Sequence, residues 1–190
     1  APAIIFDEGH WSYEEVNSRV NRVANHLISR GVKPEVLVGV SLERSPELIV
    51  SILGVMKSGG AWVALDPTLP AGRLQTYLED AGCGLALVDA AGQEALKGRA
   101  ISLGAVSGQL VSWRHSGVSI GSSDRMLVKA SYSFDMFVHE AFVPLTVGGA
   151  LVVAAPGSEF DPHELARQIR DHSVTVMKTT PTLLRMLLEM

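Results

Sequence analysis

The sequence has little cysteine: Cys83 is the one thiol among its 190 residues. A single thiol excludes an internal disulfide and a cysteine-based metal cluster, and its place near the end of an expected helix favours a small core residue. No uninterrupted apolar stretch approaches membrane-spanning length, and the first residues lack a basic region followed by a long apolar run. These absences predict a cytoplasmic chain with no membrane contact.

An excess of basic charge is also missing. The chain has 16 basic and 20 acidic residues, which gives a net charge of −4. The basic residues are scattered and form no stripe, so binding to a nucleic-acid backbone has no electrostatic support. No histidines or carboxylates occur at metal-ligand spacing. The sequence therefore predicts neither a nucleic-acid partner nor a metal site.

The segment from 45 to 67 has the pattern of a helix followed by a strand. Ser45 and Pro46 form a hydroxyl cap and a first-turn proline, and apolar residues follow at helical spacing as far as Met56. Gly59 and Gly60 end this predicted helix, and residues 62–65 read as a short strand. Because the helix is apolar nearly all round, we expect it to be buried at the centre of a domain.

Similar alternation of helices and apolar strands continues along the rest of the chain except between Ala90 and Asp124, where the sequence favours either a flexible linker or a surface segment with a weak strand over 100–103. Such alternation predicts an α/β fold with mostly parallel, doubly wound sheets flanked by helices. We expect a first unit over 1–103, a Gly/Ser-rich seam over 104–124 and a second unit over 125–190. The predicted strands are 4–6, 11–13, 36–40, 62–65, 85–88, 125–129, 151–155 and 174–177, and the helices are 12–30, 45–58, 70–81, 134–147, 161–172 and one beginning at 180.

Two segments resemble core motifs of the adenylation domains of nonribosomal peptide synthetases. Met56 to Pro67 resembles the pattern Leu-Lys-Ala-Gly-x-Ala-Tyr-x-Pro-Leu-Asp-Pro, with Trp62 for the tyrosine and Ala64 for the proline. Trp11 to Val16 resembles Leu-Thr-Tyr-x-Glu-Leu. The resemblance implies the N-terminal subdomain of an adenylate-forming enzyme, in which both motifs are structural.

A third segment, Ser131 to Glu140, resembles the family motif Phe-Asp-x-Ser followed by Val-Trp-Glu. In that family the aspartate pairs with the α-ammonium group of the amino-acid substrate. The resemblance implies this role for Asp135 and places Met136 and His139 in the lining of the side-chain pocket. Two residues depart from the pattern, Phe137 at a small hydroxyl position and His139 at a tryptophan. The alternative is that Asp135 caps the helix over 134–147 and His139 lies on its surface.

The phosphate-binding loop of the family, Thr-Ser-Gly-Ser-Thr-Gly-x-Pro-Lys-Gly, is absent from the sequence. Only residues 104–112 separate the parts that resemble its two flanks, so we expect a deletion at the seam. Gly148 and Gly149 do not replace the loop, because they follow a helix and precede a strand, whereas phosphate loops need the reverse order. The later adenine-binding motifs and the C-terminal domain with the catalytic lysine are also missing from these 190 residues.

Three functions fit these observations. The leading interpretation is a degenerate, truncated adenylation domain that acts as a non-catalytic scaffold or docking element beside condensation or carrier domains, with an MbtH-like protein as a further partner. The second is a fragment of an active amino-acid-adenylating ligase, completed by the rest of its polypeptide. The third is an unrelated α/β binding domain. On the leading interpretation we expect no catalytic residue and no cofactor, although the family uses ATP and Mg, and exposure of apolar side chains at Trp113, Leu184, Leu187 and Leu188.

Overall fold

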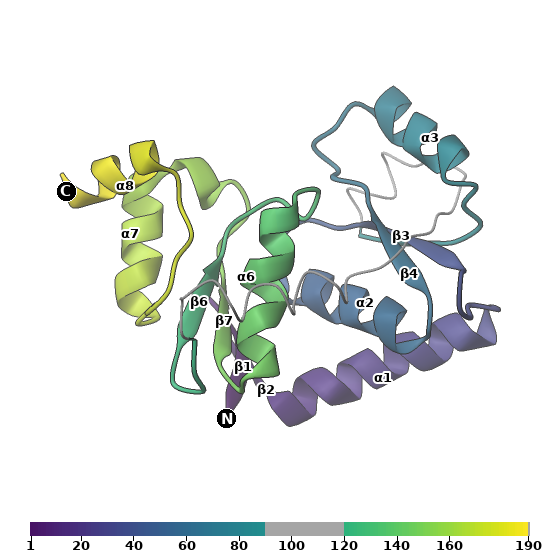
Figure 1. Ribbon diagram of the computed structural model, residues 1–190, viewed down its shortest axis with the longest axis horizontal. Helices are drawn as coiled ribbons and strands as arrows, with labels where there is room; N and C mark the ends of the chain where they lie inside the picture. The colour runs from purple at the N-terminus through teal and green to yellow at the C-terminus, as the bar shows by residue number, and fades with distance from the viewer. Residues whose placement is uncertain (90–119, 190) are drawn as a thin grey trace. The chain divides into compact units, whose positions relative to one another are not determined.

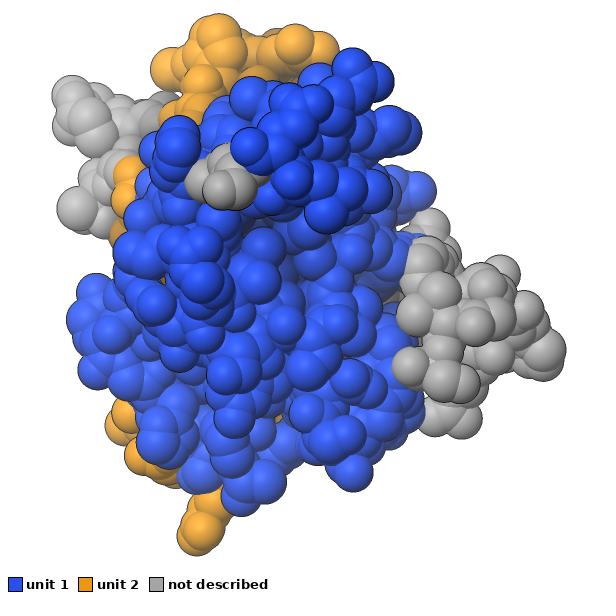
Figure 2. Space-filling model, turned by 90° about the vertical axis from the view of Figure 1, so that its left-hand side faces the viewer, with its two compact units in different colours: residues 1–13, 107–190 blue, residues 14–106 orange. Residues whose placement is uncertain are grey.

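The computed structural model describes residues 1–89 and 120–189 (Figure 1). The chain divides into two compact units: unit 1 comprises residues 1–13 and 107–190, and unit 2 comprises residues 14–106 (Figure 2). Most of the expected seam, residues 104–119, lies outside the described residues. Each unit is described by itself below.

The sheet of unit 2 is parallel throughout. Its strand order is β4-β3-β5, with β3 at Leu37–Ser41, β4 at Ala61–Ala64 and β5 at Ala86–Val88. Val38 pairs with Trp62, and Val40 pairs with Leu87. The predicted parallel sheet is therefore confirmed, with strand boundaries within one residue or so of those expected.

Helix α2 (Pro46–Lys57) is the central helix that the sequence predicts. Its N-terminus is capped by Ser45, whose Oγ accepts a hydrogen bond of 3.2 Å from the backbone N–H of Leu48. At its other end Gly59 has a φ of +86°, which glycine adopts without steric cost. The helix contacts β3 and β4 and buries apolar side chains on several sides, namely Leu48, Ile49, Val50, Ile52 and Val55.

Two further helices complete the described part of unit 2. Helix α1 (Tyr13–Ser29) enters the unit at Glu14 and comes so close to α2 that a Cβ added to Gly54 would lie 2.5 Å from Cγ1 of Val23. Helix α3 (Ala71–Asp80) buries Leu74 and Leu78 against Leu65. The apolar periodicity of α1 and α3 thus reflects side chains that are buried in the structure, namely Val16, Val20, Ala24, Leu27, Leu74 and Leu78.

The sheet of unit 1 has the order β2-β1-β7-β6, with β1 at Pro2–Phe6, β2 at Gly9–Ser12, β6 at Arg125–Val128 and β7 at Ala150–Val153. β1 runs antiparallel to β2 but parallel to β7, where Ile4 pairs with Leu151. The prediction that residues 1–103 form one unit is corrected here, because the first two strands join the sheet of the other unit. Their apolar side chains explain this, since Ala3 and Ile4 are fully buried and need partners on both sides.

Tyr13 attaches the end of the β1–β2 hairpin to the turn before β7. Its hydroxyl donates a hydrogen bond of 2.6 Å to the carbonyl oxygen of Gly149. Burial raises the pKa of this phenol, so it stays protonated and remains a donor. Tyr13 belongs to the motif Trp11 to Val16, which was expected to be structural, and this contact is a structural one.

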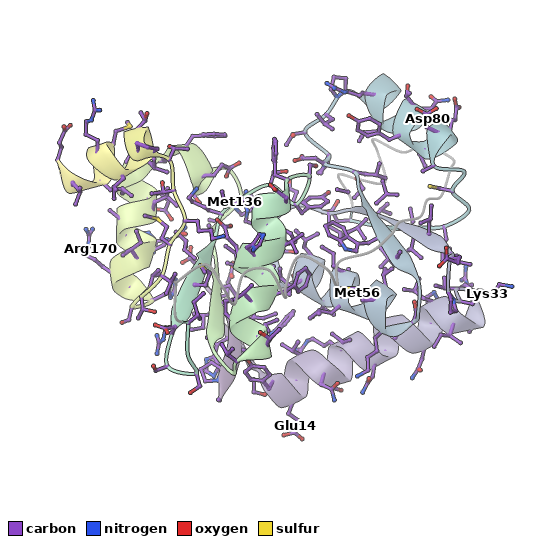
Figure 3. The ribbon with its side chains drawn as sticks, in the orientation of Figure 1. Glu14, Lys33, Met56, Asp80, Met136 and Arg170 are labelled. Carbon is purple, nitrogen blue, oxygen red and sulfur yellow. The ribbon has the colours of Figure 1, made fainter. Side chains whose placement is uncertain are left out.

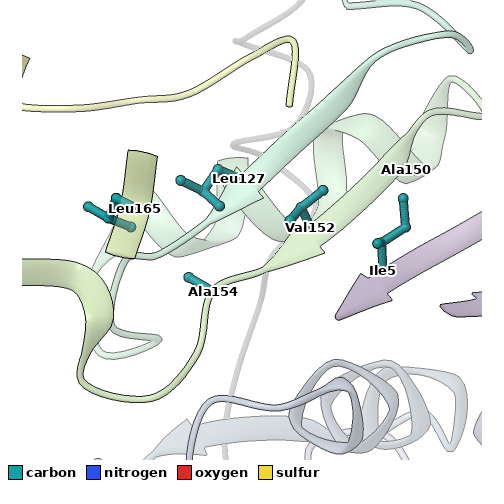
Figure 4. Close-up of a cluster of buried hydrophobic side chains, with 6 residues drawn as sticks. All are labelled: Ile5, Leu127, Ala150, Val152, Ala154 and Leu165. Atoms are coloured by element: carbon teal, nitrogen blue, oxygen red, sulfur yellow. The ribbon is translucent and has the colours of Figure 1, made fainter. Parts of the chain in front are cut away.

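Helix α7 (Pro162–Asp171) covers a buried cluster in unit 1 (Figure 4). The cluster joins three strands to the helix through Ile5, Leu127, Ala150, Val152, Ala154 and Leu165. Asp161 caps α7 as predicted, because its carboxylate accepts hydrogen bonds from the backbone N–H groups of His163 and Glu164. A 3-10 helix at Ser158–Phe160 and helix α8 (Pro181–Leu188) lie next to α7.

The predicted strand over 174–177 is wrong. This segment makes a single bridge to the sheet, between Met126 and Val176, where the Val176 carbonyl accepts from the N–H of Leu127. The N–H of Val174 instead donates to Ile169 and closes the end of α7. Ser173 has a φ of +51°, a left-handed conformation that does not occur in a regular strand. The chain therefore turns directly after α7, and the extended segment that follows is short.

The expected exposure at helix α8 is confirmed in part. Leu184 is 44% exposed and Leu188 is 78% exposed. Leu187 differs, because it packs against the cluster of Figure 4 and is partly buried. Trp113 lies outside the described residues.

Arg167 joins the β1–β2 turn to α7. Its guanidinium lies 2.9 Å from Asp7, 2.6 Å from Glu164 and 3.0 Å from Asp171. The hydrogen bonds from Arg167 are the main cause that lowers the pKa of Glu164 from 4.5 to about 2. The pKa of Asp7 is also lowered, chiefly by its hydrogen bond with His172.

Unit 1 should accordingly lose stability in acid. A carboxylate whose pKa is lower in the folded state contributes stability above its unfolded pKa, and this stability is lost as the pH falls through the folded pKa. For Glu164 the window runs from pH 4.5 down to about 2. The change should be modest, because these ion pairs are partly exposed and screened. The urea midpoint should be lower at the acid end of this window than at its upper end, and this fall should be smaller in Arg167→Met than in the unmodified chain. An equal fall in both proteins would contradict the assignment.

Candidate functional site

Asp135 is the first residue of helix α6 (Asp135–Thr146), which contacts β6 and β7. The N-cap residue is Phe134, in an extended conformation and without a side-chain cap hydrogen bond. The alternative that Asp135 caps this helix is therefore wrong. Its carboxylate is exposed in the first turn, where the helix dipole favours a negative charge.

Met136 and His139 lie one turn apart on the same helix. Met136, which is labelled in Figure 3, lies on α6. Its exposed fraction is 43%, whereas that of His139 is only 9%. The alternative that His139 lies on the helix surface is therefore also wrong. Burial lowers the pKa of His139, and the nearby charge of Lys178 lowers it further, against the opposing effect of Asp135. His139 is therefore a neutral, polar group beside Asp135 at neutral pH.

Lys178 belongs to the same group of side chains, although no motif in the sequence selects it. The bridge between Met126 and Val176 runs parallel, so the chain that follows Val176 passes beside the end of β6. Burial lowers the pKa of Lys178, while the charges of Glu140 and Asp135 raise it. The site thus combines an exposed carboxylate with a partly buried ammonium group and a neutral imidazole.

Glu140 is the second residue that sequence reasoning left out. Its side chain is 0% exposed, and its Oε2 accepts hydrogen bonds of 2.8 Å from the backbone N–H groups of both Lys129 and Ala130. β6 ends at Val128, where the next two N–H groups turn to this carboxylate. The signal in the sequence is the glutamate that ends the third motif, to which the resemblance attached no role.

Phe137 does not face the site. It is fully buried, and its ring meets Tyr132 and Phe142 edge-on, with centroids 6.2 Å apart in each pair. The departure from a small hydroxyl residue therefore enlarges the aromatic core beneath α6. Asp135, Met136 and His139 keep the spacing that the motif requires.

Gly148 and Gly149 stop a helix, as predicted. α6 ends at Thr146, Gly148 has a φ of +80°, and β7 begins at Ala150. A Cβ on Gly149 would lie 3.0 Å from one backbone carbonyl oxygen and 3.1 Å from another, so close approach of main chains also demands glycine. Anions are not attracted to such a ring of carbonyl oxygens.

Residues 1–89 and 120–189 contain no cluster of His, Cys, Asp and Glu that could hold a metal ion. Over the same described ranges, no helix is both long and apolar enough to cross a membrane.

Comparison with known proteins identifies the family. The model of the AMP-binding enzyme family matches residues 1–111 and 95–190. The chain belongs to the AMP-binding enzyme family. Two similar relatives are tyrocidine synthase 3 of Brevibacillus parabrevis and malpinin synthetase of Mortierella alpina. The first is 30% identical to this chain over 96% of its length, and the second is 31% identical over 100%. The predicted resemblance to adenylation domains of nonribosomal peptide synthetases is thereby confirmed.

Solved structures of the AMP-binding enzyme family agree with the fold. The nonribosomal peptide synthetase FmoA3, in its α-methyl-L-serine-AMP-bound form, superposes on 100% of this chain with a TM-score of 0.84 and 26% identity. The predicted α/β class with mostly parallel sheets is confirmed. The chain covers 26% of that structure, 4% of tyrocidine synthase 3 and 3% of malpinin synthetase.

The alignments to the AMP-binding family also show an internal difference in length. The alignment with malpinin synthetase runs over 235 positions, whereas the chain supplies 190 residues, so 45 positions of the relative have no counterpart. The family model matches in two segments that overlap between residues 95 and 111.

Proposed function

We propose that this chain is a non-catalytic remnant of a nonribosomal peptide synthetase adenylation domain, which keeps the amino-group contact of Asp135 and lacks the phosphate loop. The observation that carries this proposal is the internal shortfall of 45 positions against malpinin synthetase. The overlap of the two family matches at residues 95–111 supports a deletion at that place, where the sequence also predicts one.

The chemistry of adenylation supports the loss of activity. Activating a carboxylate requires preorganised amides, cations and a metal ion that stabilise charge on the α-phosphate and on the departing pyrophosphate. The sequence contains no loop of glycines and hydroxyl residues that ends in a lysine. Lys57 is occupied elsewhere, because its Nζ donates to Oδ1 of Asn17. ATP and Mg therefore have no site of their own in this proposal.

The amino-group contact rests on the geometry of α6. Asp135 presents an exposed carboxylate, with Met136 exposed beside it and the neutral His139 one turn further along. A carboxylate in this setting can form a charge-assisted hydrogen bond with an ammonium group. The structure of FmoA3 contains an aminoacyl adenylate, which is consistent with an amino-acid pocket in the shared fold. Without a phosphate site, the contact should bind an amino acid only weakly.

The second candidate is a fragment of an active ligase, in which the rest of the polypeptide supplies the ATP and Mg sites. The small share of each relative that this chain covers favours it. In either case we expect neighbouring condensation or carrier domains as partners, together with an MbtH-like protein. The exposed Leu184 and Leu188 of α8 are among the apolar residues available for such contacts.

Pyrophosphate exchange tests the loss of activity. The purified chain, with magnesium ATP and each of the twenty amino acids in turn, should show no exchange above the blank without amino acid. The control variant is Asp135→Ala, and tyrocidine synthase 3 serves as the active reference. Exchange that Asp135→Ala abolishes would contradict the proposal and favour the second candidate. Exchange by a longer parent polypeptide, but not by this chain, would also support the second candidate.

A further inference from the structure

The buried carboxylate of Glu140 has no part in the amino-group contact, yet it is held by strong interactions. Its Oε2 accepts two backbone hydrogen bonds, each 2.8 Å long, and the side chain is fully buried. A buried carboxylate is costly unless it is hydrogen-bonded or paired with a cation. Lys178 supplies an opposite charge nearby, since the carboxylate of Glu140 raises the pKa of that lysine while burial lowers it. The cost of burying Glu140 is thus offset by hydrogen bonds from the backbone, with the charge of Lys178 as a further favourable effect.

The backbone that Glu140 holds is the segment 129–134, which connects β6 to α6. The N–H groups of Lys129 and Ala130 begin this segment. Further along, the buried ring of Tyr132 packs edge-on against Phe137, and the N–H of Phe134 donates to the carbonyl of Ser131 at 3.0 Å. Asp135 follows directly, so its place depends on how this segment is fixed.

We propose that Glu140 is the positioning residue of this site: from just over one turn along α6, its carboxylate fixes the segment 129–134 and so determines where Asp135 stands. The inference rests on the proposed function, in which Asp135 meets an ammonium group. It extends that function by giving the site a support built from its own helix. A displacement of about 1 Å in a binding group is enough to weaken a site of this kind.

Native-state hydrogen exchange tests the support directly. In Glu140→Ala, protection of the amides of Lys129 and Ala130 should fall at least ten-fold more than protection of the β7 amides, because the hydrogen bonds lost are to a charged acceptor. Glu140→Gln keeps one oxygen acceptor, so its loss of protection at Lys129 and Ala130 should be smaller than that of Glu140→Ala. Glu189→Gln, which removes an exposed carboxylate, is the matched control and should change protection neither at Lys129 and Ala130 nor in β7. A uniform loss across all these amides would mean a merely structural role and would overturn the proposal.

A titration with glycinamide tests the consequence for Asp135. This probe carries an α-ammonium group but no side chain and no carboxylate, so it tests the ammonium contact apart from side-chain and carboxylate recognition. Shifts of the first-turn amides of α6 should show weak binding, which Asp135→Asn abolishes, Glu140→Ala weakens about ten-fold and Glu189→Gln leaves unchanged.

The outcomes separate the two proposals. Binding that Asp135→Asn removes but Glu140→Ala leaves intact would overturn the positioning role while the amino-group contact stands. If the unmodified chain does not bind glycinamide, the amino-group contact fails, and the role of Glu140 in supporting it fails as well, whatever the exchange data show. If Glu140→Ala does not fold, Glu140→Gln decides: unchanged protection at Lys129 and Ala130 together with unchanged affinity would overturn the proposal.

Discussion

Replacing Ile52 by alanine is expected to lower the free energy of unfolding by about 2–5 kcal/mol. Ile52 is completely buried on α2, the helix that contacts β3 and β4 in unit 2. The loss combines the transfer free energy of the deleted methyl and methylene groups with the cavity that they leave. Because α2 packs on several sides, the surrounding side chains have little freedom to fill that cavity.

Chemical denaturation in urea measures this effect, with the midpoint lowered and the slope unchanged. Ile52→Val deletes a single methylene and should cost about 0.5–1.5 kcal/mol. Ile28, which is 52% exposed on α1, supplies the surface control, and Ile28→Ala should change stability by about 0.5 kcal/mol or less. A loss near zero for Ile52→Ala would show that α2 is not the centre of the core.

Gly54→Ala should destabilise unit 2 by about 2 kcal/mol, although alanine is the better helix former. The added Cβ would lie 2.5 Å from Cγ1 and 2.7 Å from Cβ of Val23. A Cβ cannot swing aside as the end of a flexible side chain can, so α1 and α2 must move apart. Overpacking of this kind costs typically about 1–3 kcal/mol and can cost more, whereas the gain in helix propensity is at most about 1 kcal/mol.

Gly72→Ala is the matched control for this prediction. Gly72 also lies in a helix, α3, but a Cβ added there would meet nothing within 4 Å. The same substitution should therefore be neutral or stabilising by up to about 1 kcal/mol. Val23→Ala should restore part of the stability of Gly54→Ala when the two are combined, because it removes the Cγ1 contact. Equal effects of the two glycine substitutions would refute the close helix packing.

The sequence predicted local features of the fold well and long-range ones less well. Ser45 and Gly59 mark the ends of α2 through their own side-chain and backbone chemistry, which a sequence displays directly. The pairing of Ile4 with Leu151 joins residues that are far apart in the sequence. It depends on which sheet offers a free edge to β1, and the residues around Ile4 do not indicate which sheet that is. The strand predicted over 174–177 failed for a related reason, since apolar alternation there serves the end of α7 and a single bridge.

The candidate site shows the same division. Asp135, Met136 and His139 share one helix, so a motif could place them together. Lys178 comes from another part of the chain and reaches the site through the bridge at Val176. Glu140 lay inside the motif, but its partners are backbone N–H groups, which have no signature in a sequence.

The pairing of β1 with β7 has a consequence for synthesis on the ribosome. The strands described in unit 2 pair with one another within residues 37–88, so this unit can begin to fold while the rest of the chain is still being made. Strand β1 leaves the ribosome first of all the strands described here but must wait for Leu151 and Val152 before its inner edge is covered. At about 5–20 residues per second, that wait is on the order of ten seconds. During that time the apolar side chains of β1 and its unpaired edge are exposed, so we expect a chaperone to bind this strand in the nascent chain.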